Sequence, residues 1–220
     1  NVYLASRGHK SGSWTSQAHQ NVRVAELLKS THQSNEWIEA GNLSDREQFL
    51  TTSGQPIRRW GWKEPNAHVL LPFLLAALPN MRYIHVTRHG LDMAHSSNQT
   101  QLKVWGARLL GRAVDTRSAD DSLAYWCAAH ERLLQLCELA DQQILILSFE
   151  RLFTDADSTL NNLCSFLGLP NTLATARETL SALDAPQTIG RHRELQRLDV
   201  SKANRRLLHR LGYDIENHTG

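Results

Sequence analysis

Two patterns of apolar residues divide the chain into elements. Short apolar runs at 1–6, 81–88 and 143–150 predict β-strands. Between and after these runs, apolar residues recur at helical spacing and predict α-helices at 16–32, 66–79, 122–140 and 158–170. Because strands alternate with helices, we predict an α/β fold, a parallel sheet flanked by helices on both faces.

Local signals strengthen two of these elements. The run at 143–150 is continuously apolar, which is typical of a strand covered on both faces. The helix at 158–170 is expected to stop at Gly168 and Pro170, because glycine and proline favour helix ends. Two polar segments, 33–57 and 106–121, predict loops.

The bulk composition is that of one soluble globular domain. The chain has 220 residues, 41% hydrophobic and 21% charged, which is enough for a core without disulfides or metal. Its three cysteines, Cys127, Cys137 and Cys164, fall in apolar helical patterns, so we expect reduced thiols in the core. A formal net charge of +2 does not favour nucleic-acid binding, and no nucleic-acid partner is predicted.

Targeting signals are not evident in the sequence. No apolar run approaches the roughly 18–20 residues of a membrane span, and no secretory signal opens the chain. We therefore predict a cytoplasmic protein with no membrane span in this chain. Residues 1–220 are expected to form a single domain, which starts at Asn1 and could lack an N-terminal part.

The segment 82–101 joins a predicted strand to a predicted helix through Arg88 and Gly90. In parallel sheets, ligands bind beyond the carboxyl ends of the strands, where Arg88 would lie. A guanidinium there suits a phosphate, and Ser96, one to two turns into the helix, could bind the same anion. The residues alone leave open an alternative, in which Arg88 pairs with Asp92 and Ser96 is solvated.

Three segments together resemble the sulfotransferases that use 3′-phosphoadenosine 5′-phosphosulfate (PAPS). Residues 60–99 are similar to the family's lysine–proline segment, helix, strand and Arg…Ser element. Residues 145–170 resemble its strand, Tyr-Glu-Asp-Leu turn and Phe-Leu-Gly helix, and residues 189–195 its basic C-terminal loop. The order and spacing of these segments imply a P-loop NTPase-like three-layer sandwich. They also imply transfer of a sulfuryl group from PAPS to an acceptor hydroxyl or amine.

The resemblance assigns roles to residues at the predicted sheet edge. Arg88 and Ser96 would bind the 3′-phosphate of PAPS, and Arg191 and Arg193 would close over it. For the two loop arginines, the sequence alone favours an exposed basic loop. Phe149 stands where the family often has tyrosine, and core packing is its favoured role.

The phosphosulfate-binding loop is expected within residues 3–17. There, Lys10, Ser11, Gly12 and Ser13 resemble the family's Lys-Ser-Gly-Thr-Thr-Trp loop, one residue short. Lys10 would balance charge on the bridging oxygen, and the next three residues would offer backbone N–H groups. The polar sequence that follows differs from the apolar helix of the family, so a plain Gly/Ser loop is the alternative.

The segment around Lys63 is the candidate catalytic element. In the resemblance this lysine approaches the sulfuryl group and stabilises charge on the leaving phosphate. Glu64 and His68 are the candidate bases for the acceptor proton, because Pro65 fills the place where some relatives have a catalytic histidine. An ion pair between Lys63 and Glu64 is the alternative.

The remaining signals limit the cofactors and partners. The eleven histidines include no pair at metal-ligand spacing with a third ligand nearby, so PAPS is the expected cosubstrate and no metal is predicted. The acceptor is expected to be a small molecule or a glycan. A non-catalytic sulfotransferase-like binding protein with a degenerate phosphate loop is the alternative function. A nucleotide-dependent kinase-like phosphotransferase would need Gly-x₄-Gly-Lys-Ser/Thr and a strand-end aspartate, which the sequence lacks.

Overall fold

A computed structural model describes residues 63–169, 174–195 and 198–214 of the chain. The predicted strand 1–6, helix 16–32 and loop 33–57 lie outside these residues. The elements, in chain order, are α4 (Ala67–Ala77), β1 (Tyr83–Thr87), α5 (Gly90–Ala94), α6 (Thr100–Leu110), α7 (Ala119–Leu139), η1 (Asp141–Gln143), β2 (Ile144–Ser148), α8 (Arg151–Thr154), α9 (Ala156–Leu167), α10 (Ala174–Ser181), η2 (Arg191–Arg193) and α11 (Lys202–Arg210), where η marks a 3₁₀ helix. The elements predicted from residue 66 onward are confirmed as α4, β1, α7, β2 and α9.

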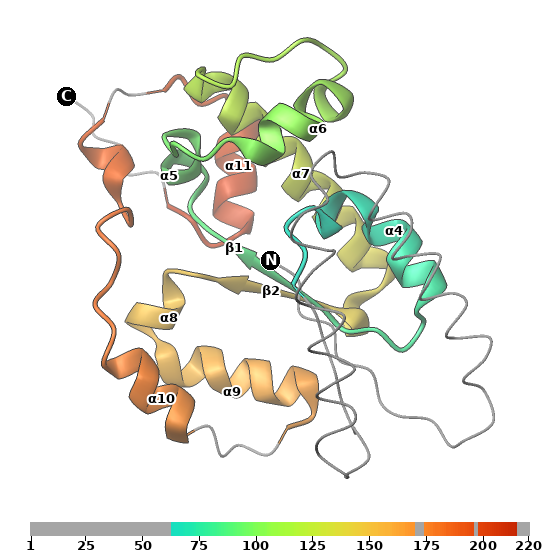
Figure 1. Ribbon diagram of the computed structural model, residues 1–220, viewed down its shortest axis with the longest axis vertical. Helices are drawn as coiled ribbons and strands as arrows, with labels where there is room; N and C mark the ends of the chain where they lie inside the picture. Colours follow the sequence, from blue (N-terminus) through green and yellow to red (C-terminus); the bar gives the residue numbers. More distant parts are fainter. Residues whose placement is uncertain (1–62, 170–173, 196–197, 215–220) are drawn as a thin grey trace, which may run out of the picture.

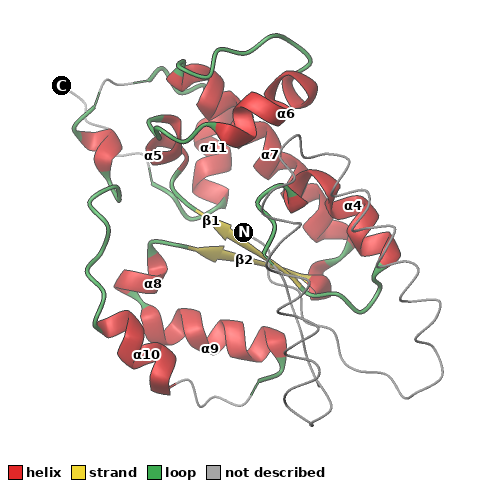
Figure 2. Cartoon of the chain, viewed as in Figure 1, coloured by secondary structure: helices red, strands yellow, loops and turns green. Residues whose placement is uncertain are grey.

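The two described strands pair in parallel (Figure 2). Tyr83 lies opposite Ile144, and Thr87 lies opposite Ser148. The N–H of Phe149 donates to the carbonyl of Thr87 at 2.9 Å, so the pairing continues just past β2. Parallel strands require a long crossover, which here contains α5, α6 and α7. The predicted α/β fold with a parallel sheet is therefore confirmed.

Helices lie on both sides of this sheet, with α4 and α7 on one side and α9 along the other (Figure 1). The core between α4, α7 and the strands contains Leu71, Leu74, Tyr83, Leu133 and Ile144. A second core joins α5, α7 and α11 and contains Leu91, Leu123, Trp126, Leu207 and Leu208. Helix α7 thus contributes to both cores, and the first of them packs against the strands.

The segment after β1 differs from the prediction. The helix α5 ends at Ala94, so Ser96 lies beyond it and not one to two turns inside it. Residues 106–121, predicted as a loop, contain the end of α6 and the start of α7. The helix α6 was not predicted because its buried stripe is narrow and consists of Leu102, Trp105 and Gly106.

Gly90 is the first residue of α5, and close packing explains why a glycine stands there. It does not adopt a positive φ, so a tight turn does not require it. A Cβ at this position would lie 2.9 Å from Cε3 of Trp126 and 3.0 Å from Cδ2 of Leu208. The absent side chain therefore lets α5 approach α7 and α11 closely.

A chain of buried polar side chains crosses the interface between β1 and α7. His130 Nδ1 donates to the carbonyl of Trp126 at 2.7 Å, so His130 Nε2 is an acceptor. The Thr87 hydroxyl lies 3.0 Å from this Nε2, and His85 Nε2 lies 3.3 Å from it. His85 Nδ1 in turn lies 3.0 Å from the Tyr83 hydroxyl. His85 is therefore a strand residue whose two ring nitrogens both have hydrogen-bonding neighbours.

Burial keeps both imidazoles neutral. Desolvation lowers the pKa of His130 from 6.5 to about 4. Desolvation, followed by the neighbouring His130, also lowers the pKa of His85 well below its usual value. At mildly acidic pH these histidines therefore bind protons in the unfolded chain but stay neutral in the folded chain.

We expect the free energy of unfolding to fall as the pH drops from the unfolded-state pKa of 6.5 toward about 4. For His130 alone the shift corresponds to about 3 kcal/mol, at about 1.4 kcal/mol per pKa unit. Urea unfolding at about pH 7.5, 6 and 5 measures this slope. His130→Gln, which does not titrate, should flatten it, whereas the exposed His209→Gln on α11 should not. An equal slope in His130→Gln would contradict the assignment.

Candidate functional site

Arg88 directly follows β1 and is half-buried. Its Nη2 donates to Oγ1 of Thr188 at 2.9 Å, and its guanidinium carbon lies 4.8 Å from the centroid of the Phe149 ring. The Arg88 Nε is buried and has no hydrogen-bond partner among the described residues. The guanidinium therefore keeps a donor for an anion at the carboxyl end of the sheet.

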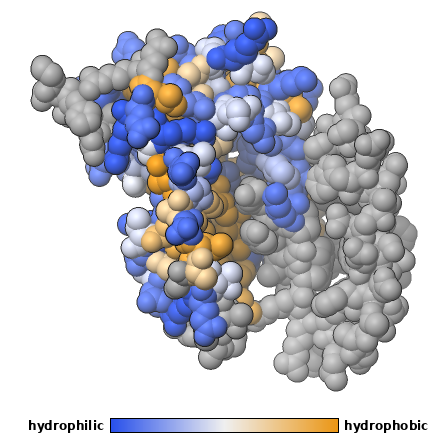
Figure 3. Space-filling view, turned by 60° about the vertical axis from the view of Figure 1, so that its left-hand side comes forward, coloured by the Kyte–Doolittle hydropathy of each residue, from blue (hydrophilic) through white to orange (hydrophobic). Residues whose placement is uncertain are grey.

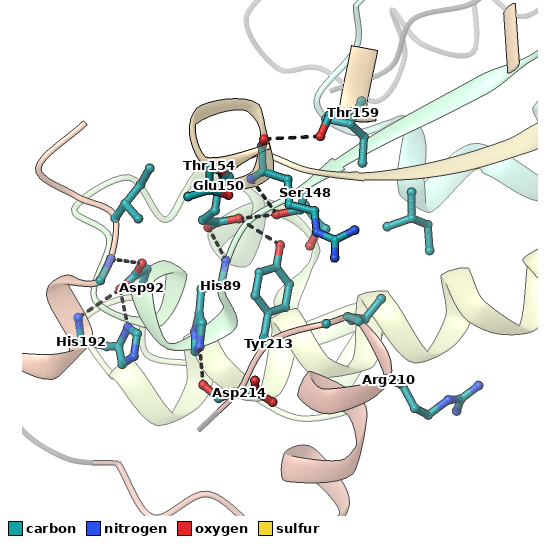
Figure 4. A pocket seen from close by; sticks show the side chains of 18 of the residues that line it. His89, Asp92, Ser148, Glu150, Thr154, Thr159, His192, Arg210, Tyr213 and Asp214 are labelled. Carbon is teal, nitrogen blue, oxygen red and sulfur yellow. Dashed lines mark hydrogen bonds and ion pairs between the residues drawn. The ribbon is translucent and has the colours of Figure 1, made fainter. Parts of the chain in front are cut away.

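The loop of residues 188–193, named here the C-terminal loop, packs against α5. Asp92, which is fully buried in α5, accepts hydrogen bonds from this loop with both carboxylate oxygens (Figure 4). Oδ2 accepts from the N–H of Gly190 at 2.7 Å, and Oδ1 accepts from the N–H of His192 at 3.0 Å. The Nδ1 of His192 also lies 2.6 Å from Oδ1. The alternative in which Asp92 pairs with Arg88 is therefore wrong.

Glu150 joins three segments at the ends of the strands (Figure 4). Its Oε1 accepts from the N–H of His89 at 2.8 Å, in the turn between β1 and α5. Its Oε2 accepts from the hydroxyl of Ser148 at 2.8 Å and from the hydroxyl of Tyr213 at 3.2 Å. This carboxylate thus fastens the ends of β1 and β2 to the segment after α11.

The imidazoles of His89 and His192 stack on each other. Their ring centroids lie 4.2 Å apart, with an interplanar angle of 18°. His89 Nδ1 accepts from the N–H of Leu91 at 3.2 Å, so His89 Nε2 carries the proton. Burial, followed by the neighbouring His192, lowers the pKa of His89. The loop is therefore held to the strand end by ring contact as well as by hydrogen bonds.

A pocket of about 830 Å³ opens at the carboxyl ends of the two strands. Thr87, Ser148 and Glu150 line one part of it, and Gly190, His192 and Arg193 of the C-terminal loop line another. Its volume lies in the range of roughly 300–1,000 Å³ that is usual for small-molecule sites. Figure 3 shows hydrophobic residues gathered in the middle of a face whose outer parts are mainly hydrophilic. The pocket combines apolar strand residues with charged loop residues.

The predicted phosphate-binding residues are partly brought together. Arg88 contacts Thr188 in the C-terminal loop, which also carries Arg191 and Arg193. Arg191 Nε donates to the backbone carbonyl of Asp92 at 2.9 Å, and Arg193 lines the pocket.

Ser96 is engaged in a local turn. Its hydroxyl accepts from the N–H of Asn98 at 3.3 Å, and Gln99 Nε2 donates to its carbonyl at 2.8 Å. Lys10, Ser11, Gly12 and Ser13 lie outside the described residues.

Glu64 of the predicted catalytic segment supports the start of α4. It is 3% exposed, and its Oε1 accepts from both the N–H and the side-chain amide of Asn66 at 2.9 Å. Asn66 Oδ1 accepts from the indole N–H of Trp105 in α6 at 2.9 Å. Lys63, by contrast, is exposed.

His68 is also held by its neighbours. Its Nδ1 donates to the carbonyl of Pro65 at 3.0 Å, so its Nε2 accepts from the Tyr125 hydroxyl at 2.8 Å. Desolvation by burial is the main cause that lowers the pKa of His68 to about 4. The imidazole is therefore neutral and weakly basic at neutral pH.

Sequence reasoning did not assign Asp92, Glu150, His192 or Tyr213 to the site. The available signal for Asp92 was its position in the first turn after the strand that ends in Arg88. Its loop partners lie about a hundred residues away, since the separation from Gly190 is 98 and from His192 is 100. No local pattern predicts such a contact.

The three cysteines are free thiols in the structure. Cys127 and Cys164 are buried, and Cys137 is half-buried.

No group of His, Cys, Asp or Glu in residues 63–169, 174–195 and 198–214 could hold a metal ion. None of the helices described in these ranges has the length and apolar character to cross a membrane.

Comparison with known proteins points to one family. A family model described as "Sulfotransferase family" matches residues 5–173, which is most of the chain. A solved structure titled "Sulfotransferase Domain from the Curacin Biosynthetic Pathway" is similar at 12% identity and a TM-score of 0.42. That similarity covers 87% of this chain and 78% of the other chain. No curated protein matches the chain.

The contacts of Glu150 predict that its role is structural and depends on hydrogen bonding. Glu150→Ala leaves the N–H of His89 without its carboxylate acceptor and should lower the free energy of unfolding by about 2 kcal/mol. Glu150→Gln should cost less than half of this, because its carbonyl oxygen can face His89 while its amide donates to rotatable hydroxyls. Chemical denaturation of the two variants measures the difference. Equal losses of stability in the two variants would show that the hydrogen bonds of residue 150 do not determine its contribution to stability.

Proposed function

This chain belongs to the sulfotransferase family, and on that premise we propose that it transfers a sulfuryl group from PAPS to an acceptor hydroxyl or amine. PAPS supplies the activated sulfuryl group, and the chain's own residues bind its phosphates and stabilise charge on the leaving phosphate. The acceptor is proposed to be a small molecule or a glycan.

The Nε of Arg88 carries the proposal, because it is buried and has no hydrogen-bond partner among the residues that the structure describes. A buried donor without an acceptor is costly, and a phosphate oxygen would satisfy it. Arg88 lies at the carboxyl end of a parallel strand, where ligands of such sheets bind. The Phe149 ring and Thr188 hydroxyl hold the guanidinium from two sides, so the donor is already oriented.

The remaining cations suit the same ligand. Arg191 and Arg193 are proposed to contact the 3′-phosphate from the C-terminal loop. Ser96 is proposed to contribute its hydroxyl, and residues 10–13 to bind the phosphosulfate. Each contact would place a donor or a positive charge on a strongly charged anion.

Within the segment 63–68, the geometry favours different roles for the three candidates. Glu64 is buried and holds Asn66, and the His68 imidazole is neutral with both nitrogens hydrogen-bonded. These contacts favour structural roles for Glu64 and His68. Lys63 is exposed, and we propose that it stabilises negative charge on the leaving phosphate.

Arg88→Ala should weaken binding of the product 3′-phosphoadenosine 5′-phosphate (PAP) by about 1.5–3 kcal/mol, because a charge-assisted contact is lost. Isothermal titration calorimetry measures the change. The exposed Arg108→Ala on α6 removes the same charge away from the strand end and serves as control. If the wild-type chain bound no PAP at tens of micromolar, the proposed function would be wrong.

Lys63→Ala should lower kcat about 10²-fold while PAP affinity stays nearly unchanged, because charge on the leaving phosphate develops mainly in the transition state. PAPS turnover with a panel of hydroxyl and amine acceptors measures kcat, and calorimetry measures affinity. The exposed Lys103→Ala is the matched control. Tight PAP binding by the wild-type chain without turnover of any acceptor would favour the non-catalytic alternative.

A further inference from the structure

We propose that Asp92 is a positioning residue that fixes the C-terminal loop (residues 188–193) on α5 and so directs Arg191 and Arg193 to the 3′-phosphate of the cosubstrate. The identity of the ligand in this inference rests on the proposed function. The role of Asp92 in holding the loop rests only on the hydrogen bonds between Asp92 and the loop.

Three donors of the C-terminal loop converge on the Asp92 carboxylate. They are the backbone N–H of Gly190 on Oδ2, and the backbone N–H and ring Nδ1 of His192 on Oδ1, at 2.6–3.0 Å. Only an ionised carboxylate offers two oxygens that both act purely as acceptors. These contacts therefore require an aspartate, and an asparagine at this position would lose at least one of the hydrogen bonds.

The charge state of Asp92 agrees with this geometry. Burial alone raises its pKa, but hydrogen bonds from the His192 side chain and from the backbone N–H groups of His192 and Gly190 lower the pKa to about 2. Asp92 is thus ionised at neutral pH although it is fully buried. A buried charge is tolerated when its hydrogen bonds are satisfied, and here the loop satisfies them.

The contacts also fix the position of Arg191, which lies between the two residues that bind the carboxylate. Its Nε donates to the backbone carbonyl of Asp92 at 2.9 Å. Gly190 adopts a φ of 79°, a left-handed conformation that favours glycine and turns the chain into η2. Since its Nε is held by the start of α5, Arg191 has only its terminal Nη groups left to reach a ligand.

A second contact ties the same loop to the proposed phosphate site. Thr188, two residues before Gly190, accepts from Arg88 Nη2 at 2.9 Å. The loop is thus held at Thr188 by the arginine that follows β1, and at residues 190–192 by the aspartate of α5. Loss of Asp92 would free the part that carries Arg191 and Arg193 while leaving Arg88 in place.

The decisive comparison is Asp92→Asn with two nucleotides, PAP and adenosine 5′-monophosphate (AMP), which lacks the 3′-phosphate. The amide N–H₂ of asparagine must face a loop donor, so the loop should detach on one side. We expect PAP binding to weaken about tenfold, or about 1.4 kcal/mol, and AMP binding to change less than about twofold. Isothermal titration calorimetry gives both constants.

The change in charge alone predicts the opposite effect on the affinity for PAP. Removing a negative charge near an anion site should strengthen phosphate binding, so weaker PAP binding would indicate lost positioning. Asp120→Asn, at an exposed position in the first turn of α7, makes the same change in charge and should alter neither constant. Equal weakening of PAP and AMP would indicate a general structural defect and overturn the inference.

Limited trypsin digestion tests the fastening without reference to the ligand. Cleavage after Arg191, identified by mass spectrometry, should be slow in the wild-type chain and at least about tenfold faster in Asp92→Asn, because proteases cut locally opened segments. His192→Phe keeps a ring to stack on His89 and removes one donor, so it should show a smaller increase. It also provides the test if Asp92→Asn does not fold.

The two experiments distinguish failure of the proposed function from failure of the role proposed for Asp92. If the wild-type chain binds no PAP but Asp92→Asn is cut faster, the proposed function fails and Asp92 still fastens the loop. If PAP binds and Asp92→Asn is cut faster with unchanged PAP affinity, the loop is fastened but does not position the arginines, and the inference is wrong. Unchanged cleavage in both variants would overturn the fastening itself.

Discussion

Parallel hydrogen bonding between β1 and β2 sets the carboxyl ends of the two strands side by side, and the candidate site is built on this pairing. Thr87 lies opposite Ser148, and the N–H of Phe149 continues the ladder to the Thr87 carbonyl. The residues after each strand therefore meet at one edge. Thr87 and Ser148 line the pocket, while the next residues, Arg88 and Phe149, contact each other.

Two carboxylates then organise what surrounds this edge. Glu150 holds the turn after β1 and the segment after α11, and Asp92 holds the C-terminal loop. Both act as acceptors for backbone N–H groups, which are available whatever the neighbouring side chains are. A carboxylate used in this way fixes the path of the main chain, and the cationic side chains on that path are positioned as a consequence. Arg191 and Arg193 depend on this arrangement, whereas Arg88 is positioned by the strand.

The sequence predicted the elements whose apolar pattern is strong. The strands β1 and β2 and the helices α4, α7 and α9 have continuous or periodic apolar residues, and each was found. The helix α6 was missed because few of its apolar residues are buried: Leu102, Trp105 and Gly106 are, whereas Val104 is exposed. The place of Arg88 at the end of a strand could be predicted because a strand end is a local feature of the sequence. Asp92 was considered only as a partner for Arg88, because its true partners lie about a hundred residues along the chain.

Glu64 and His68 show how side chains at positions that match a family pattern can be held by structural contacts. An acid and a histidine beside a lysine suggest a base for the acceptor proton. In the structure Glu64 accepts from Asn66, whose side chain in turn accepts from Trp105. His68 accepts from the Tyr125 hydroxyl and has a pKa lowered by burial to about 4. His68 is then a poor base at neutral pH, since efficient general bases have a pKa near the working pH, and Glu64 already accepts hydrogen bonds from Asn66. Stabilisation of the leaving phosphate by positive charge does not depend on such a base, and the exposed Lys63 is the side chain proposed for it. Under the proposed function, this chain would therefore depend more on electrostatic stabilisation by its cations than on proton removal by the segment after Lys63.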